Sequence, residues 1–472
     1  MSLFRAFLLR STSARWRSSS TMTPVRCHLL IRALTRFSII TALSTALTLG
    51  TLASLDPHNP KASGRLSSEA AAGAAYLGAL LVGLVLFSWV RILLFPSAGK
   101  RSVDEPEARA DRGEGSWRTA LAKAHSPAHL RPRVAWPTIA LAAAGLGTWI
   151  GAAWLGHTGL LSTPFASLLC TVGIFLCFTP MHDAVHGAVA PKWRTLNTAV
   201  GMAASLPFVG MYRAFRLIHL AHHAHLNESE LDPDHWAGAG PLVLLPLRWA
   251  TGFYYYVSFA IERSVEEQVD YPQRKPGRWR NVVELDLAAT PAVYMTVLWW
   301  VWDVSAVAFW LFPFVGAATY LLYTFDYLPH RPHKSLDQYL ATSVTTGVPS
   351  PLLSVLLLSQ NMHNIHHLAP SVPFYRYGDV WHICREELLK SGTRQLPWVL
   401  WPTRERHLRE LGRGGGGGGW GAPPARGVPG GARGTTPHSQ PRPPHGTSDQ
   451  VGGRVHPTFD RVKSHKAENV TE

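Results

Sequence analysis

The sequence has few charged side chains and few cysteines. Only 16% of the 472 residues are Asp, Glu, Lys or Arg, while 46% are hydrophobic. This is less charge than soluble domains usually carry, so the composition points toward a membrane protein. Cys27, Cys170, Cys177 and Cys384 stand far apart and form no Cys-x-x-Cys pair. The pattern therefore predicts neither a disulfide framework nor an iron–sulfur site, and ordinary buried thiols are expected.

Acidic residues are absent from the first 36 positions, which hold seven arginines. The formal net charge of +15 is concentrated here and in the C-terminal tail. No DNA or RNA recognition motif accompanies it, so nucleic acid is not expected as a partner. Residues 1–36 have the composition of an organelle transit or targeting segment. The alternative is a basic flank that orients a first membrane span.

Apolar runs are abundant where charge is scarce. Runs long enough to cross roughly 30 Å of hydrocarbon occupy residues 37–55, 70–90, 135–154, 160–179, 287–302 and 304–325. They predict an all-α, polytopic membrane protein with a core of four transmembrane helices and one or two extra N-terminal spans. Shorter apolar pieces are expected to lie in the interface or to re-enter the membrane; they are residues 196–211, 241–261 and 351–358.

The chain divides into four parts by composition. A targeting segment, residues 1–36, is followed by N-terminal spans with a basic loop, residues 37–133, and then by the main domain, residues 134–402, which holds the other apolar runs. Residues 403–472 contain runs such as RGGGGGGWGAPPARG, which cannot bury enough apolar surface to offset the entropy cost of folding. This Gly/Pro-rich tail is expected to be disordered.

Histidines are gathered in three compact boxes. The boxes are MHDAVHG with His182 and His186, HLAHH with His219, His222 and His223, and HNIHH with His363, His366 and His367. Side chains at positions i, i+3 and i+4 share one face of a helix, so each box aims its imidazoles at a common point. A single histidine pair is usually a polar surface group, but three such boxes predict a metal centre.

Eight imidazoles are too many for one ion, so two metal ions are expected. Neutral imidazole suits iron, zinc, copper and nickel. Iron is favoured, because a redox-inert zinc pair explains neither the membrane setting nor the lack of a carboxylate base in the boxes. Asp183, Asp232 and Asp234 lie beside the boxes and are candidates to accept a hydrogen bond from a ligand imidazole. Each could equally cap a helix, and LDPD is typical of a turn.

The order of the spans predicts that the boxes meet on one side of the membrane. The span that ends at residue 179 delivers His182 to one face, and the next two spans go out and return, so His330 and His363 emerge on that same face. The loop over residues 91–133, with nine Arg or Lys, falls there too. The positive-inside rule makes this the cytoplasmic face or its organellar equivalent, stroma or matrix.

These boxes, in this order, resemble the membrane fatty-acid desaturase and hydroxylase superfamily over roughly residues 134–389. FDYLPHRPH and QNMHNIHHLAPSVPFYRY look like the cyanobacterial and algal type of β-carotene hydroxylase. The resemblance implies a desaturase-like helical core with a helical cap, on the cytoplasmic side, that holds a di-iron site. It also implies a ninth ligand, which matches His330, and a water-linked polar residue, which matches Asp326. Asp326 stands where desaturases have Asn, so direct binding, binding through water or orientation of His330 all remain open. His333 is a weaker candidate ligand.

The same resemblance implies a non-haem di-iron oxygenase that uses O₂ and electrons from an external donor protein, with ferredoxin expected in a plastid membrane. The expected reaction is hydroxylation of β-carotene ring carbons to give cryptoxanthin and zeaxanthin. An acyl-lipid desaturase and a carotenoid ketolase of the same superfamily are the alternatives, because all three share the box geometry. A catalytically silent lipid-binding relative would be expected to have a broken box, and none is broken here.

Overall fold

The structure is a computed structural model that describes residues 24–54, 127–228, 231–270, 277–303, 305–331, 335–346 and 350–397. Several predictions from the sequence lie outside these residues. They are the span at residues 70–90, most of the basic loop, the Gly/Pro-rich tail, His333 and the first part of the targeting segment.

The described chain is almost entirely helical. Within it, five helical segments are long and apolar enough to cross a membrane: His28–Leu49, Trp136–His157, Thr163–Val185, Arg278–Trp302 and Val307–Tyr327. The last four match the predicted core and the first is an additional N-terminal span. The prediction of an all-α, polytopic membrane protein is confirmed.

Helices α6 (Trp136–His157) and α7 (Thr163–Val185) form a close hairpin. Two glycines make the approach so close. A Cβ on Gly173 would lie 2.6 Å from the backbone nitrogen of Trp149, and a Cβ on Gly145 would lie 2.7 Å from Cys177 Sγ. Small residues at a crossing let two membrane helices come into backbone contact, and this contact fixes where α7 ends and the first histidine box begins.

The second hairpin contains several π-helical turns. Its first arm runs through α12 (Arg278–Asn281), η4 (Val282–Ala289) and α13 (Thr290–Trp302), and the chain reverses at Asp303. The return arm consists of η5 (Val307–Leu311), α14 (Phe312–Leu321) and η6 (Leu322–Tyr327). The π-helical segments are η4, η5 and η6. Such turns often occur at functional sites, and η6 leads directly to His330.

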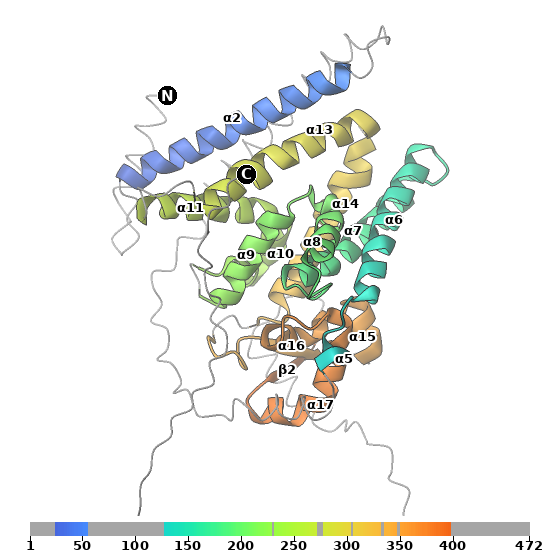
Figure 1. The fold of residues 1–472 in the computed structure, drawn as a ribbon, viewed down its shortest axis with the longest axis vertical. Helices are drawn as coiled ribbons and strands as arrows, with labels where there is room; N and C mark the ends of the chain where they lie inside the picture. Colours follow the sequence, from blue (N-terminus) through green and yellow to red (C-terminus); the bar gives the residue numbers. More distant parts are fainter. Residues whose placement is uncertain are drawn as a thin grey trace, which may run out of the picture. The chain divides into compact units, whose positions relative to one another are not determined.

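The N-terminal helix α2 (Pro24–Ser54) packs against α11 (Gly252–Asp270), η4 and α13. In Figure 1 it runs beside α13. Ala33 and Phe37 are buried in the apolar cluster that α2 shares with these helices, and Arg36 pairs with Glu284 at 3.8 Å. The predicted boundary after residue 36 therefore falls inside a helix that is already packed from Ala33 onward.

Shorter helices connect the two hairpins. Near the metal centre α8 (Arg194–Ala204), η1 (Leu206–Phe208) and α9 (Tyr212–Ala224) are followed by η2 (Pro233–Ala237), η3 (Leu242–Leu244) and α10 (Leu245–Ala250). The apolar pieces predicted at residues 196–211 and 241–261 fall on α8 with η1 and on η3, α10 and α11. None of these is among the membrane-spanning candidates of the described chain.

The C-terminal part of the domain forms a cap beneath the hairpins, at the lower end of Figure 1. Its elements are β1 (Ser343–Thr346), α15 (Ser350–Leu356), η7 (Gln360–Met362), α16 (His363–Leu368), η8 (Phe374–Arg376), α17 (Tyr377–Lys390) and β2 (Arg394–Pro397), with α5 (Pro127–Leu130) packed against them. Strands β1 and β2 pair in parallel, with Ser343 opposite Arg394. The cap core centres on Tyr377, Val380 and Leu388.

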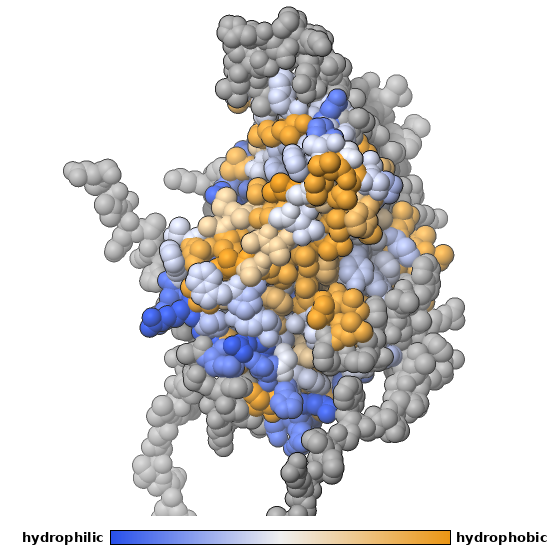
Figure 2. Space-filling model, turned by 90° about the vertical axis from the view of Figure 1, so that its right-hand side faces the viewer, coloured by the Kyte–Doolittle hydropathy of each residue, from blue (hydrophilic) through white to orange (hydrophobic). Residues whose placement is uncertain are grey.

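Large apolar side chains cover the outside of the spanning helices. Trp154, Phe165, Leu168, Val301 and Phe312 are all at least half exposed. Figure 2 shows the resulting broad hydrophobic area on one face, with hydrophilic side chains below it. Exposed apolar surface of this extent indicates contact with lipid, and the chain is an integral membrane protein.

Candidate metal centre

The first histidine box lies where α7 ends. His182 is in the last turn of α7 and His186 is its C-terminal cap residue. Gly187 follows with φ of +72°, a left-handed conformation that glycine adopts without steric cost. The chain can therefore turn away directly after His186 and leave both imidazoles facing inward.

The other two boxes lie on short helices. His219, His222 and His223 share one face of α9, and His363, His366 and His367 belong to α16. His330 lies in the turn after η6. All four stretches meet at the same end of the two hairpins, as the order of the spans predicts.

Eight of the nine predicted ligand histidines fall into two groups whose ring nitrogens lie within 4.8 Å of one another. The first group is His182, His186, His219 and His366, and the second is His222, His330, His363 and His367. His223 lies between them, close to His366 and His367. Each group combines residues from at least three separate stretches of the chain.

The spacing of the imidazoles fits metal coordination. The Nε2 atoms of His182 and His366 are 3.1 Å apart, and those of His219 and His186 are 2.9 Å apart. Adjacent nitrogens bound octahedrally at about 2.1 Å would be separated by about 3.0 Å. Many imidazole nitrogens converge in each group, and the few protons they could share would leave some lone pairs without a hydrogen-bond partner. A cation at the centre of each group would bind these lone pairs.

Six of the imidazoles are held in the neutral form that binds metal. Burial, with repulsion from neighbouring imidazoles, holds the pKa of His219, His223 and His363 well below its usual value. Burial likewise lowers the pKa of His186, His366 and His367. A protein that keeps these groups uncharged leaves their lone pairs available to a cation.

His222 has a carboxylate partner that orients it. Its Nδ1 lies 2.7 Å from Asp232 Oδ1 and 3.4 Å from Asp234 Oδ2. Burial lowers the pKa of His222, but these carboxylates outweigh burial and raise it to about 9. With a metal in place, an Nδ1–H donated to Asp232 would leave Nε2 for coordination. Asp232 also caps η2, because its Oδ1 accepts from Asp234 N at 2.9 Å. It therefore acts both as the partner of a box imidazole and as a helix cap, the two alternatives that the sequence left open.

Two further partners of the box histidines could not be read from the sequence. Gln360 Oε1 lies 2.9 Å from His363 Nδ1, and the Tyr377 hydroxyl lies 3.1 Å from His366 Nδ1. Both leave Nε2 directed at the centre. Gln360 stands three residues before His363, and this short spacing is the one sequence feature that could have indicated the contact. Tyr377 reaches His366 only because α17 packs on α16.

Asp183 was a candidate hydrogen-bond acceptor for a ligand imidazole, but its carboxylate has other partners. Its Oδ2 accepts from the Thr138 hydroxyl at 3.0 Å and from Phe374 N at 3.2 Å. Among the described residues, no hydrogen bond joins this carboxylate to the imidazole of a box histidine. The carboxylate instead links α6 and α7 to the cap at η8, so it fixes the position of the first box relative to the third.

Asp326 and His330 make different contacts. His330 packs its ring against His222 and His363, with both centroid separations at 4.8 Å. Asp326 lies in the π-helical η6 and bonds to the Tyr256 hydroxyl at 2.9 Å. It belongs to neither imidazole group of the described chain. Asp326 lies in the π-helical turn and His330 in the turn that follows it, so the role of Asp326 at the metal stays a prediction.

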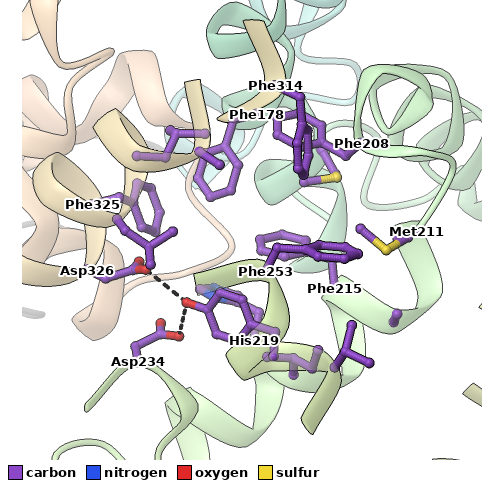
Figure 3. Close-up of a pocket in the computed structure, with 18 of the residues that line it drawn as sticks. Phe178, Phe208, Met211, Phe215, His219, Asp234, Phe253, Phe314, Phe325 and Asp326 are labelled. Atoms are coloured by element: carbon purple, nitrogen blue, oxygen red, sulfur yellow. Dashed lines mark hydrogen bonds between the residues drawn. The ribbon is translucent and has the colours of Figure 1, made fainter. Parts of the chain in front are cut away.

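An apolar cavity adjoins the imidazoles (Figure 3). Its lining is mainly aromatic and aliphatic, and its polar members are His219, Asp234, Tyr256 and Asp326. Phe215 stacks on His219 with 5.4 Å between ring centroids, and Phe325 packs edge-on against His182 at 4.9 Å. The cavity and the imidazole groups therefore share a wall of rings.

Histidine boxes on spanning and interfacial helices, next to an apolar cavity, define a membrane-embedded metalloenzyme of the oxidoreductase type. A family model described as fatty acid desaturase matches residues 158–397. This is about half of the chain, and the chain belongs to the fatty acid desaturase family. Family membership and the histidine groups together indicate a non-haem iron centre.

Curated relatives fall into two kinds. A β-carotene ketolase from Paracoccus sp. is 30% identical over 244 residues, covering 50% of this chain and 86% of the relative. A zeaxanthin 4-ketolase from Chlamydomonas reinhardtii is 27% identical over 220 residues, covering 46% and 43%. An sn-1 oleoyl-lipid 12-desaturase from Synechocystis sp. is 27% identical over 262 residues, covering 48% and 70%. The family model and these relatives confirm the predicted membership of the membrane fatty-acid desaturase and hydroxylase superfamily.

Proposed function

We propose that this protein is a di-iron oxygenase that hydroxylates a ring carbon of β-carotene or a related carotenoid. One oxygen atom of O₂ enters a C–H bond as hydroxyl, and the other leaves as water with two electrons and two protons. An external donor, expected to be ferredoxin in a plastid membrane, supplies the electrons. The products are cryptoxanthin and then zeaxanthin.

The observation that carries the proposal is the convergence of nine imidazoles beside one apolar cavity. His182, His186, His219, His223 and His366 would hold one iron, and His222, His330, His363 and His367 the other. When bound, the iron pair supplies O₂ activation and hydrogen abstraction from an unactivated C–H. The ferredoxin partner and the stromal or cytoplasmic location of this face are part of the proposal.

The chain's own residues position the substrate and exclude water. Phe178 contacts both Phe215 and Phe325 where the cavity adjoins the imidazoles, with ring centroids 5.3 Å and 4.8 Å apart. A wall of rings keeps bulk water from the metal side while a flat apolar group lies against it. Holding the reacting carbon at a fixed distance contributes a large part of the rate.

The cavity is of suitable size for one end of a carotenoid. Its volume is about 110 Å³, and a buried water takes roughly 10–15 Å³ on the same scale. The cavity therefore accepts a group of roughly ten non-hydrogen atoms, such as a methylated cyclohexene ring. The polyene would extend from the ring into the bilayer, whose thickness it roughly matches.

Ring ketolation is the second candidate function, and the ketolase relatives favour it. It would require repeated oxidation at one ring carbon in place of a single hydroxylation. Acyl-lipid desaturation is the third, favoured by the desaturase relative. FDYLPHRPH and SVPFYRY are the features that favour the hydroxylase.

The decisive experiment is expression of the full chain in bacteria that accumulate β-carotene, with a ferredoxin system, followed by pigment chromatography. His366→Ala serves as the inactive control. Cryptoxanthin and zeaxanthin are expected. Keto-carotenoids would move the assignment to ketolase, and unchanged β-carotene with new unsaturated fatty acids would move it to desaturase.

A further inference from the structure

The polar end of the cavity is built from three different elements. The Tyr256 hydroxyl, from α11, lies 2.9 Å from Asp234 Oδ1 of η2 and 2.9 Å from Asp326 Oδ2 of η6. These are the two dashed lines in Figure 3. Both carboxylates are almost completely buried. The Tyr256 hydroxyl therefore lies between the two carboxyl groups: its one proton is donated to one of them, and its oxygen can accept from the other when that carboxyl is protonated.

The two carboxylates differ in their other contacts. Asp234 Oδ2 lies 3.4 Å from His222 Nδ1, and Asp234 N is fixed by Asp232 Oδ1 at 2.9 Å. Asp234 is therefore anchored at a turn beside the second imidazole group. Asp326 is carried by the π turn of η6 and is bonded at Oδ2 to Tyr256. The hydroxyl consequently connects a fixed carboxylate to one that would otherwise be free to rotate.

A buried carboxylate without a hydrogen-bond partner turns toward the nearest positive charge, because an unpaired buried charge is costly. Four residues after Asp326 the chain reaches His330, a member of the second imidazole group. A cation in that group is the strongest positive charge in reach. Within the described part of the chain, the hydrogen bond between the Tyr256 hydroxyl and Asp326 Oδ2 is the contact that opposes such a rotation.

We propose that Tyr256 is a positioning residue, whose hydroxyl holds Asp326 at the edge of the substrate cavity and keeps its carboxylate out of the iron coordination sphere. An iron held by His222, His330, His363 and His367 would then be ligated by imidazoles without the Asp326 carboxylate. The assignment rests on the proposed di-iron centre and deepens it, since it states which side chain sets the role of Asp326.

Tyr256→Phe is the direct test in the purified, iron-loaded full chain. The nine imidazoles are untouched, so two irons per chain are expected, as in the wild type. Released Asp326 is expected to bind iron, which appears as a changed Mössbauer quadrupole splitting and an added Fe–O scattering shell in X-ray absorption. kcat should fall roughly 10- to 100-fold, the usual effect of losing an outer partner, while KM changes less than about threefold.

Tyr255→Phe is the matched control. Tyr255 neighbours Tyr256 on α11 but stacks on Trp236 at 4.5 Å and is not part of the cavity lining. It should leave the Mössbauer spectrum and kcat of the wild type unchanged. An equal spectral change in both variants would contradict a specific role for Tyr256.

Asp326→Asn tests whether Tyr256 acts through Asp326. In this background Tyr256→Phe should add little further loss and no further spectral change, because the two residues act as one unit. Fully additive effects, or an unchanged spectrum in Tyr256→Phe alone, would overturn the proposal. The spectroscopic readouts need no turnover, so they decide the role of Tyr256 even if no carotenoid product forms.

Discussion

The candidate site depends on individual imidazoles whose second ring nitrogen is held by a named partner. His222 bonds to Asp232, His363 to Gln360 and His366 to Tyr377. Each partner fixes which nitrogen faces the centre. The histidine boxes were predicted from local spacing alone. Tyr377 and Tyr256 were not, because their contacts depend on how separate helices pack, and Gln360 was not, although it stands only three residues before His363.

His330→Ala should remove iron from the second group while the first group still binds. The iron content of the purified protein is expected to fall by about half, and turnover should be lost. Total iron by mass spectrometry measures this directly. His225→Ala is the control, because His225 is half exposed and pairs with Glu228 at 3.3 Å; it should retain full iron content.

Tyr377→Phe should weaken iron retention without emptying the site. The lost hydroxyl frees the His366 imidazole to rotate, and an outer partner of this kind typically contributes 10- to 100-fold in metal affinity or activity. The rate of iron loss to a chelator measures the effect. Tyr375→Phe, two residues away and half-buried, should lose iron at the wild-type rate.

The helices position these residues, and the long membrane-spanning helices were predicted from the length of the apolar runs in the sequence. The four core spans agree with the predicted runs to within a few residues at most ends, although the arm before Asp303 begins earlier, at Arg278. The π-helical turns were not foreseen, since hydropathy carries no signal for them. One of them, η6, carries Asp326, and His330 lies in the turn that follows it.

Gly173→Ala should destabilise the α6–α7 hairpin. Its new Cβ would meet the backbone of Trp149, and backbone cannot yield as a flexible side chain does. Overpacking of this kind costs about 1–3 kcal/mol, so a melting temperature several degrees lower is expected in detergent. Gly147→Ala, which meets nothing within 4 Å, should melt at the wild-type temperature or slightly above it.

Truncation tests whether α2 belongs to the working enzyme. Removal of residues 1–36 deletes Ala33 and Arg36, which pack and pair against α11 and η4, and should lower both thermal stability and yield. Removal of residues 1–23 leaves α2 whole and should preserve both. Equal stability of the two truncated chains would contradict a structural role for the first part of α2.

Taken as a whole, the molecule places a polar metal centre at one end of an apolar helical bundle. The order of the spans was sufficient to bring the three boxes together, because two hairpins return the chain to its starting face. The wall of phenylalanines and the polar end of the cavity were beyond sequence reasoning, since they combine residues from α7, α9, α11 and η6. We expect substrate choice to depend on the phenylalanines that line the cavity, and pigment chromatography identifies which carotenoid product is formed.

The proposed oxygenase chemistry depends on iron at the histidine groups. The measurement that tests it is the metal content of the purified full-length chain, by mass spectrometry with Mössbauer spectroscopy of the same sample. Two irons per chain are predicted, and a His366→Ala variant should lose the iron of the first group. Protein that folds and is isolated with zinc, or that takes up no iron when reconstituted, would contradict the proposed di-iron centre and the oxygenase chemistry built on it.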